Sequence, residues 1–333
     1  MPIRRVPLRL SMGELFEVPS CDKCRNPAIL HQIYSGRSMC GAHLADSVRK
    51  KASKALRQQL QIPKGKHTTI LVAISGGKDS AVLLERIHEN LSKRRDVTIV
   101  AGCVDEGIEG YRPPSLECAR ELAESLGVRF ETVSYPELGF KEMDQVVTKM
   151  AEIKDRKAPC SYCGVFRRQG INHLAERVGA DVIALGHNLD DMAQTIMMNM
   201  QNGDIERTLR LAPHTSTPLA GMAPRIVPLR WIPEQEIHLY ALHKNLPIHH
   251  EECPHGEGAL RFRHRETIAM MEADVPGTRH GLLRMADDLK KLHASAGGTF
   301  NTIEPINCPE CGQICSGSLC KACEMKKAIM DED

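Results

Sequence analysis

The chain is poor in aromatic residues: only 4% of its 333 residues are Phe, Trp or Tyr, and Trp occurs once. The core that this length allows must therefore be built mostly from aliphatic side chains. The sequence also lacks an apolar run long enough to cross a bilayer, and its opening Met-Pro-Ile-Arg-Arg contains no apolar signal segment. We expect a soluble, cytoplasmic protein with no membrane partner.

An excess of charge of one sign is also absent, since the formal net charge is only +2. The distribution of charge is more informative. Basic residues concentrate between Arg49 and Lys66 and again at Arg261, Arg263 and Arg265. Such stripes can hold phosphates, although a charge run is more often a solvated helix face.

Cysteine, in contrast, is abundant, with 13 residues. In a chain of this size without secretory features, this number favours metal or sulfur chemistry over a disulfide scaffold. Cys21-x-x-Cys24 followed by Cys40-x-x-His43 has the spacing of one tetrahedral, structural zinc site, with His31 as an alternative ligand. We expect a small zinc-binding domain at this end of the chain.

Beyond this segment, a basic stretch from about Ala45 to Leu60 predicts a linker helix, which Pro63 and Gly65 end. Strand and helix patterns then alternate. Strands are expected over residues 70–74, 97–104, 128–134 and 182–185, with a short extended piece near 226–229, and helices over 79–90, 114–125, parts of 141–177, 190–201, 234–244 and 263–271. The alternation predicts an α/β fold with a doubly wound parallel sheet, in which ligands bind at the C-terminal ends of the strands.

A glycine pair follows the first of these strands, in the run Ser75-Gly76-Gly77-Lys78-Asp79-Ser80. Adjacent glycines let the backbone approach an anion, and the N–H groups of the first helical turn point towards it. The spacing is not that of a Walker A loop, and a plain turn with capping serines is the alternative. The run resembles the SGGxDS loop of ATP pyrophosphatases, enzymes that adenylate a substrate oxygen and release pyrophosphate.

Polar residues also follow the second and fourth strands. Asp105 opens the stretch that ends at Arg112, and His187 and Asp191 lie in the stretch from Gly186 to Asp191. We expect Asp105 and His187 to contact bound ATP, and Asp191 to act in catalysis through Mg²⁺ or as a base. For Asp190 and Asn188, capping of the next helix is an equally good interpretation.

A further cysteine group combines Cys160-x-x-Cys163 with the distant Cys253, and Arg167 and Arg168 follow the pair. The pair alone fits a redox centre, half a zinc site or iron–sulfur ligands. With Cys253 as the third ligand, three thiolates would hold a [4Fe–4S] cluster and leave one iron open to an exogenous ligand. The two arginines are suitably charged for a triphosphate or an RNA phosphate.

Together these motifs resemble the tRNA 2-thiolation family, the TtuA-like and cytoplasmic tRNA 2-thiolation protein group of the PP-loop ATP pyrophosphatase superfamily. The likeness covers nearly the whole chain. It includes a terminal Cys308-x-x-Cys311 with Cys320-x-x-Cys323, which implies a second zinc site to which Cys315 is surplus. Some relatives have a fourth cysteine where this chain has His43, an exchange that preserves a zinc ligand.

The resemblance implies an ATP-dependent, non-redox 2-thiolation of a tRNA uridine, with sulfur supplied by a ubiquitin-like thiocarboxylate donor. The implied cofactors are ATP, Mg²⁺, a [4Fe–4S] cluster and two structural Zn²⁺. The catalytic residues would be Cys160, Cys163, Cys253 and Asp191. We expect the wobble uridine rather than the T-loop uridine as the target, and a homodimer is compatible with the resemblance.

Two other functions fit the same residues. A cluster-free thiolase would carry a persulfide on Cys160 or Cys253, whereas a protein of another class would bind tRNA through its zinc ribbons without catalysis. In either case four regions are expected: a zinc-binding domain at 1–45, a basic linker helix at 46–66, a PP-loop catalytic domain at 67–300 and a second zinc-binding domain at 301–333.

Overall fold

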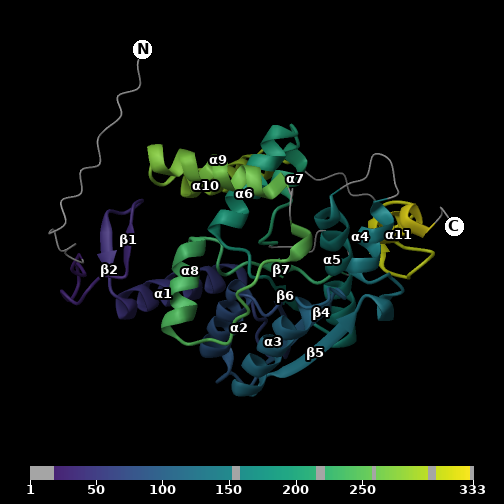
Figure 1. The fold of residues 1–333 in the computed structure, drawn as a ribbon, viewed down its shortest axis with the longest axis horizontal. Helices are drawn as coiled ribbons and strands as arrows, with labels where there is room; N and C mark the ends of the chain where they lie inside the picture. The colour runs from purple at the N-terminus through teal and green to yellow at the C-terminus, as the bar shows by residue number, and fades with distance from the viewer. Residues whose placement is uncertain (1–18, 152–157, 215–221, 257–259, 299–304, 331–333) are drawn as a thin grey trace, which may run out of the picture.

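A five-stranded parallel sheet forms the centre of the molecule, in a computed structural model that describes residues 19–151, 158–214, 222–256, 260–298 and 305–330 (Figure 1). The strand order is β5-β4-β3-β6-β7. These strands are β3 (Thr68–Ile74), β4 (Val97–Asp105), β5 (Arg129–Ser134), β6 (Val182–Ala184) and β7 (Arg225–Ile226). The chain moves outward from β3 to β5 and then returns to the other side of β3. The predicted doubly wound sheet is thus confirmed, with its switch point between β3 and β6.

Helices cover both faces of this sheet because alternate strand residues point to opposite sides. Ile70, Val72 and Ile74 of β3 belong to one core, whereas Leu71 belongs to the other. The first core includes α1 (Gly41–Gln59), α2 (Lys78–Leu91), α3 (Arg112–Ser125) and α8 (Glu234–His243). The second includes α4 (Met143–Met150), α5 (Pro159–Arg177) and α11 (Lys321–Met330).

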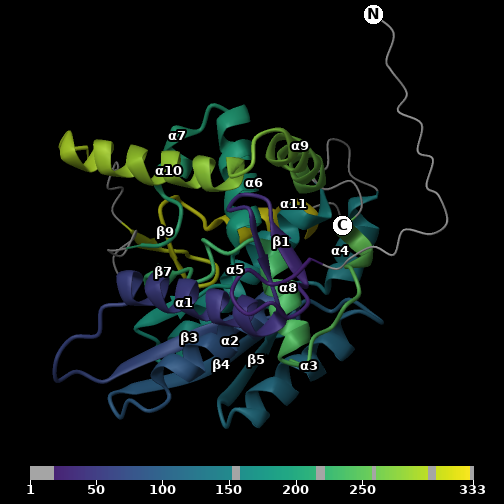
Figure 2. The ribbon, with the colours of Figure 1, turned by 90° about the vertical axis from the view of Figure 1, so that its left-hand side faces the viewer.

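A further group of helices consists of α6 (Leu189–Gln201), α7 (Ile205–Leu209), α9 (Leu260–Asp274) and α10 (Thr278–Ser295). Figure 2 shows them together above the sheet. Leu189, Met192 and Ile196 of α6 pack with Leu283 and Ala286 of α10 in a small core of their own. Helix α10 and the short α7 were absent from the sequence prediction, and α9 is longer than predicted. The apolar residues of α10 do recur at helical spacing, and its buried side chains are Leu283 and Ala286.

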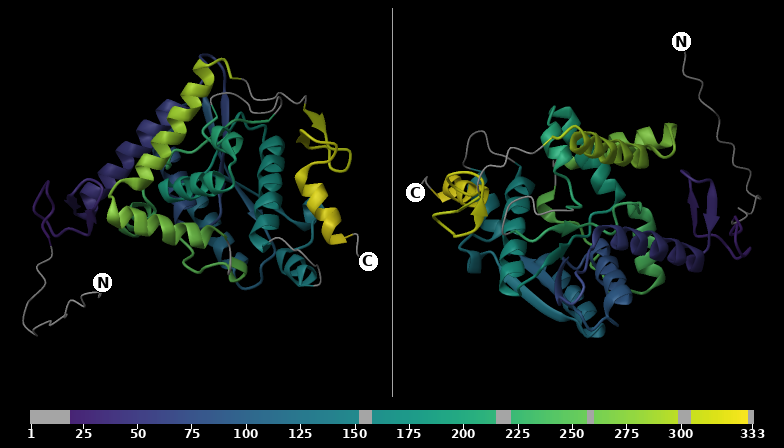
Figure 3. Two further views of the ribbon diagram at one scale, coloured as in Figure 1. Left: turned by 90° about the horizontal axis from the view of Figure 1, so that it is seen from above. Right: turned by 180° about the vertical axis from the view of Figure 1, so that it is seen from behind.

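The two terminal cysteine modules lie at opposite ends of the molecule (Figures 1 and 3). The N-terminal module contains the hairpin of β1 (Leu30–Gln32) and β2 (Arg37–Met39), and the C-terminal module contains β8 (Ile306–Asn307), β9 (Ile314–Cys315) and α11. The helix predicted over 45–60 is α1, and Leu44, Val48 and Leu56 bury its apolar face in the first core. No helix in the described ranges is both long and apolar enough to span a membrane.

Candidate active site

The turn between β3 and α2 consists of Ser75, Gly76 and Gly77. Gly76 has a φ of +82°, and a Cβ at this position would lie 1.8 Å from the carbonyl oxygen of Ser115, so only glycine fits. The hydroxyl oxygen of Ser80 accepts a hydrogen bond from the Ser75 N–H at 3.0 Å and donates to the Gly77 carbonyl at 2.9 Å. The side chains of Ser75 and Ser80 therefore stabilise the conformation of the loop. Their contact with a bound phosphate stays a prediction.

Two residues from other segments hold this loop, and one of them is Arg112. Its buried guanidinium donates to the Ser75 carbonyl at 2.9 Å and also to the Val104 carbonyl. The second is His249, whose backbone N–H donates to the Gly76 carbonyl at 2.9 Å. These two contacts join the loop to α3 and to the segment that leads to Cys253. Neither was identifiable in the sequence, where both residues lie far from the loop.

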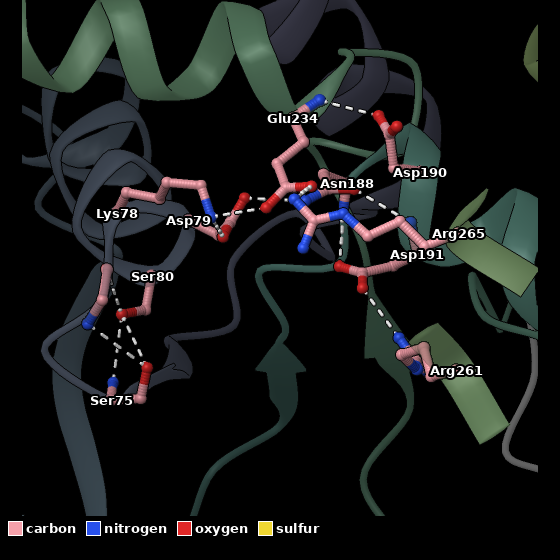
Figure 4. Close-up of polar contacts among 11 residues, drawn as sticks. Ser75, Lys78, Asp79, Ser80, Asn188, Asp190, Asp191, Glu234, Arg261 and Arg265 are labelled. Carbon is pink, nitrogen blue, oxygen red and sulfur yellow. Dashed lines mark hydrogen bonds and ion pairs between the residues drawn. The ribbon is translucent and has the colours of Figure 1, made fainter. Parts of the chain in front are cut away.

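The N-termini of α2, α6 and α8 converge beside the loop (Figure 4). Asn188 caps α6, because its side-chain oxygen accepts from the Asp191 N–H at 2.9 Å, while its amide donates to Asp79 at 2.8 Å. Asp190 accepts from the Glu234 N–H at the start of α8 at 2.8 Å. Three helix N-termini in one place provide a strongly favourable environment for a phosphate.

Capping thus explains Asn188, and the carboxylate of Asp190 serves another helix rather than its own. Asp190 also pairs with Arg279 at 3.0 Å. The carboxylate of Asp191 accepts from the Asn188 N–H at 3.2 Å and pairs with Arg261 at 2.7 Å. Of the two acidic residues, Asp191, in the first turn of α6, has its carboxylate nearer to the phosphate loop in Figure 4.

The charged groups of the site form a network of shared ion pairs. Lys78 contacts Asp79 at 3.1 Å and Glu234 at 2.8 Å, and Arg265 contacts Glu234 at 3.2 Å. Burial raises the pKa of Asp79 above its usual value, whereas the carboxylates of Asp79 and Glu234 raise the pKa of Lys78 in spite of burial. Lys78 is therefore a full positive charge at the loop. The contribution of Glu234 was not predicted from the sequence.

The other two nucleotide-contact candidates lie at the same edge of the sheet. Asp105, the last residue of β4, accepts from the Gly107 N–H at 3.0 Å, which stabilises the turn after that strand. His187 follows β6. Desolvation lowers the pKa of His187, the Asp191 carboxylate opposes this effect, and the charges of Arg261, Arg167 and Arg168 add to it. A neutral imidazole is the form that these cations favour.

The three central cysteines come from two segments. Cys160 and Cys163 lie one turn apart at the start of α5, and Cys253 directly precedes the 3₁₀ helix η2 (Pro254–Gly256). The Cys160 thiol approaches the His255 carbonyl at 3.8 Å. Burial, followed by the charges of Cys163 and Cys160, raises the pKa of Cys253. The structure thus packs the segment that carries Cys253 against α5, and the shared role of the three thiols stays a prediction.

A chain of charges connects these thiols to the phosphate loop. The Arg167 guanidinium lies 3.7 Å from the Cys163 sulfur and 3.7 Å from the Glu106 carboxylate, which in turn contacts Arg112 at 2.8 Å. Burial raises the pKa of Cys163, and Arg167 partly offsets this effect. Arg168 is not part of the chain, and burial and the charge of Arg167 lower its pKa. The buried Glu106, missed in the sequence, lies between two cations and offsets part of their charge.

The two terminal groups have the geometry of closed metal sites. In each group the four ligand atoms lie within 4.8 Å of one another. The N-terminal group consists of Cys21, Cys24, Cys40 and His43, and the C-terminal group consists of Cys308, Cys311, Cys320 and Cys323. The Cys24–Cys40 and Cys311–Cys320 sulfurs are both 3.6 Å apart. A zinc tetrahedron with Zn–S bonds of about 2.3 Å has edges of about 3.8 Å, so both groups fit Zn²⁺. His31 and Cys315 are not members of either group.

The fold and the phosphate loop define a PP-loop nucleotide-binding protein. A family model described as a PP-loop domain matches residues 46–269. The tRNA 2-thiolation protein NcsA of Haloferax volcanii is 35% identical over 93% of this chain and 98% of its own length. The mouse cytoplasmic tRNA 2-thiolation protein 1 is 33% identical over 92% of this chain and 72% of its own length.

Among solved structures, the U34-tRNA thiolase NcsA from Methanococcus maripaludis with its [4Fe–4S] cluster superposes with a TM-score of 0.71. The alignment has 30% identity and covers 82% of this chain and 88% of that one. A probable sulfurtransferase of Methanocaldococcus jannaschii is 32% identical over 93% of this chain and 87% of its own length. The chain belongs to the PP-loop family and, within it, to the tRNA 2-thiolation proteins.

Proposed function

We propose that this chain is an ATP-dependent tRNA uridine 2-thiolase with a three-cysteine [4Fe–4S] cluster. The observation that carries the proposal is the connection of two sites, since Arg112, Glu106 and Arg167 link the phosphate loop to the thiols of Cys163 and its neighbours. Such an enzyme activates the C2 oxygen of the uridine with ATP and then delivers sulfur to the carbon that bears this oxygen. It therefore needs both sites side by side.

In this mechanism the uridine C2 oxygen attacks the α-phosphorus of ATP, pyrophosphate leaves, and a sulfide nucleophile displaces AMP. The N–H groups of the loop and the charge of Lys78 would hold the pyrophosphate, and Ser75 and Ser80 keep the loop in place. Asp79, Asp191 and Asp105 offer oxygen ligands for Mg²⁺, which prefers carboxylates and phosphates. Arg167, beside both Glu106 and Cys163, would neutralise charge between the nucleotide and the sulfur. Arg168 and His187 would contact the nucleotide or the RNA backbone.

The central thiols fit a cluster better than a single ion. Their sulfurs do not form a compact group of the kind found at the two termini of the described chain. A cluster is larger than one ion and accepts more widely spaced thiolates, and Cys160 and Cys163, one turn apart, share a helix face. When bound there, a [4Fe–4S] cluster supplies an open coordination position for the sulfide.

The wobble uridine is the target that we propose, and the support is the name of the methanococcal relative as a U34-tRNA thiolase. Mass spectrometry of nucleosides from anticodon and T-loop fragments, taken from cells with and without this protein, tests the choice. We expect 2-thiouridine to disappear only from anticodon fragments. Loss confined to T-loop fragments would contradict the proposal.

The remaining parts of the proposal concern partners and organisation. The sulfur would come from a ubiquitin-like thiocarboxylate, in a cytoplasmic protein that could act as a homodimer. The zinc-binding regions 1–45 and 301–333 would serve as tRNA-docking modules on either side of the catalytic region 67–300, with 46–66 between. The position of the two cysteine modules at opposite ends of the molecule supports this division (Figure 3).

Substitution of the loop tests the adenylation step. In Lys78→Ala and Asp79→Ala we expect ATP-dependent thiolation of tRNA to fall to background, because both side chains face the phosphates and their magnesium. Zinc content and the thermal midpoint of unfolding are the controls, since neither zinc site contacts the loop. Thiolation that continues in both variants would exclude adenylation at this loop.

A further inference from the structure

Two arginines of α9 reach the phosphate loop region from the side opposite to α2 (Figure 4). Arg261 contacts Asp191 at 2.7 Å, and Arg265 contacts Glu234 at 3.2 Å. They are four residues apart and therefore share one face of the helix. Arg263 lies between them in sequence, is exposed, and is placed by the helical repeat on a different face. Only two of the three arginines in this basic cluster are thus directed at the site.

The carboxylates that these arginines contact are shared or otherwise engaged. Glu234 is contacted by both Arg265 and Lys78, and Asp191 already accepts a hydrogen bond from the Asn188 backbone. The arginine side chains are 46% and 51% exposed, so each ion pair is open to solvent and contributes little to stability. Both cations can therefore leave their carboxylates at low cost.

A polyphosphate is a better partner for the same guanidinium groups. It carries several negative charges, and its oxygens match the planar donors of arginine in bidentate pairs. A polyphosphate at the three helix N-termini would be repelled by four carboxylates, those of Asp79, Asp190, Asp191 and Glu234. Cations that move towards the polyphosphate would offset this repulsion. Arginines that already lie beside Asp191 and Glu234 need only a change of side-chain rotamer to do so.

We propose that Arg261 and Arg265 bind the β- and γ-phosphates of the nucleoside triphosphate by exchanging Asp191 and Glu234 for phosphate oxygens. The inference rests on the proposed function, because it requires ATP at the phosphate loop. Until a polyphosphate binds, the carboxylates of Asp191 and Glu234 pair with the two arginines and keep them beside the phosphate loop. Binding of the polyphosphate transfers these cations to the ligand and frees the Asp191 carboxylate for magnesium.

The test is a titration of the full-length protein with Mg-ATP, pyrophosphate and AMP by calorimetry. We expect Arg261→Ala and Arg265→Ala each to weaken ATP and pyrophosphate binding about tenfold, which corresponds to about 1.4 kcal/mol, and the double variant to weaken both about a hundredfold. AMP binding should not change. Arg263→Ala, on the same helix but a different face, is the matched control and should bind all three ligands like the wild type.

A second variant separates ligand binding from a purely structural role. Glu234→Gln removes the carboxylate that competes for Arg265 and Lys78, so pyrophosphate should bind several-fold more tightly. A structural ion pair predicts no such gain. Unchanged ATP affinity in the double arginine variant, or weaker pyrophosphate binding in Glu234→Gln with an unaltered thermal midpoint, would overturn the inference. A wild-type protein that binds no ATP would instead overturn the proposed function, and the inference with it.

Discussion

The terminal cysteine groups and the central one differ in geometry although all three use C-x-x-C spacing. Each terminal group places four ligand atoms within 4.8 Å of one another, whereas Cys160, Cys163 and Cys253 do not form so compact a set. Four ligands around one ion leave no position for a substrate. Three thiols in a wider arrangement, with an arginine beside them, suit a site that must admit a reactant. Spacing in the sequence thus identifies a ligand pair but not whether the completed site is closed or open.

The surroundings of the thiols differ in the same sense. Burial opposes ionisation of Cys21 and Cys308, but donation from several backbone N–H groups lowers the pKa of each to about 6. At Cys163 and Cys253, in contrast, burial dominates and raises the pKa. The other thiols of these groups differ, since burial raises the pKa of Cys320 to about 11 and also raises the pKa of Cys323. Each terminal group thus contains one thiol that its own backbone ionises, whereas Cys163 and Cys253 depend on a bound cation or on Arg167 to become thiolates.

Removal of a central thiol should have the largest effect. We expect Cys160→Ser, Cys163→Ser and Cys253→Ser each to abolish both iron binding and tRNA thiolation, because three ligands are the minimum for the cluster, while two equivalents of zinc remain. Metal analysis and a thiolation assay on anaerobically purified protein measure this. Iron that survives in Cys253→Ser would remove that residue from the site. A colourless wild-type protein with full activity would favour a persulfide on Cys160 or Cys253.

Removal of a terminal ligand should have a smaller effect on chemistry. In Cys21→Ser or Cys320→Ser we expect loss of one zinc, about a tenfold loss of tRNA affinity, and unchanged affinity for ATP, because neither module contributes to the phosphate loop. Binding measured at several salt concentrations shows whether the phosphate contacts are affected. If tRNA affinity and its salt dependence stay the same, the modules stabilise the fold or a dimer instead.

The stability of the terminal groups and their retention of zinc should depend on pH in a way that follows from the lowered thiol pKa values. The folded pKa values of Cys21 and Cys308, about 6, lie below the ordinary value of 9.0. Their contribution to stability is therefore complete above about pH 9 and decreases as the pH falls towards 6. We expect zinc release to a chelator to be slow at pH 8 and to accelerate steeply below pH 6. A release rate that does not vary between pH 8 and pH 5 would contradict this assignment.

Substitution of Cys315 should have the smallest effect. This cysteine is buried in the C-terminal module, but its thiol donates to the Gly317 carbonyl at 3.2 Å and it is not one of the four grouped ligands. Serine preserves the donor, so Cys315→Ser should retain both zinc ions and lower the unfolding free energy by only about 1 kcal/mol. Loss of zinc in this variant would show that Cys315 replaces one of the four ligands.

Sequence alone was sufficient wherever the physical cause is local. Three features depend only on neighbouring residues: the glycine pair of the phosphate loop, the aliphatic runs of the strands, and the spacing of paired metal ligands. The sheet and the terminal ligand groups were predicted from these features. Helix α10 is an exception, because it was missed although its apolar residues Leu282, Leu283, Ala286 and Leu289 recur at helical spacing.

Tertiary structure decided the contacts that join distant segments. The packing of η2, next to Cys253, against α5 could not be derived from the sequence, where the two segments lie far apart. Nothing in the residues around Glu106 indicates that it lies between Arg112 and Arg167. Glu234 and Arg265 acquire their positions only when α8 packs against α2 and α9 packs against α6. The reason is that electrostatic partners are set by distance in space, whereas sequence patterns report only which side chains share a strand, a turn or a helix face.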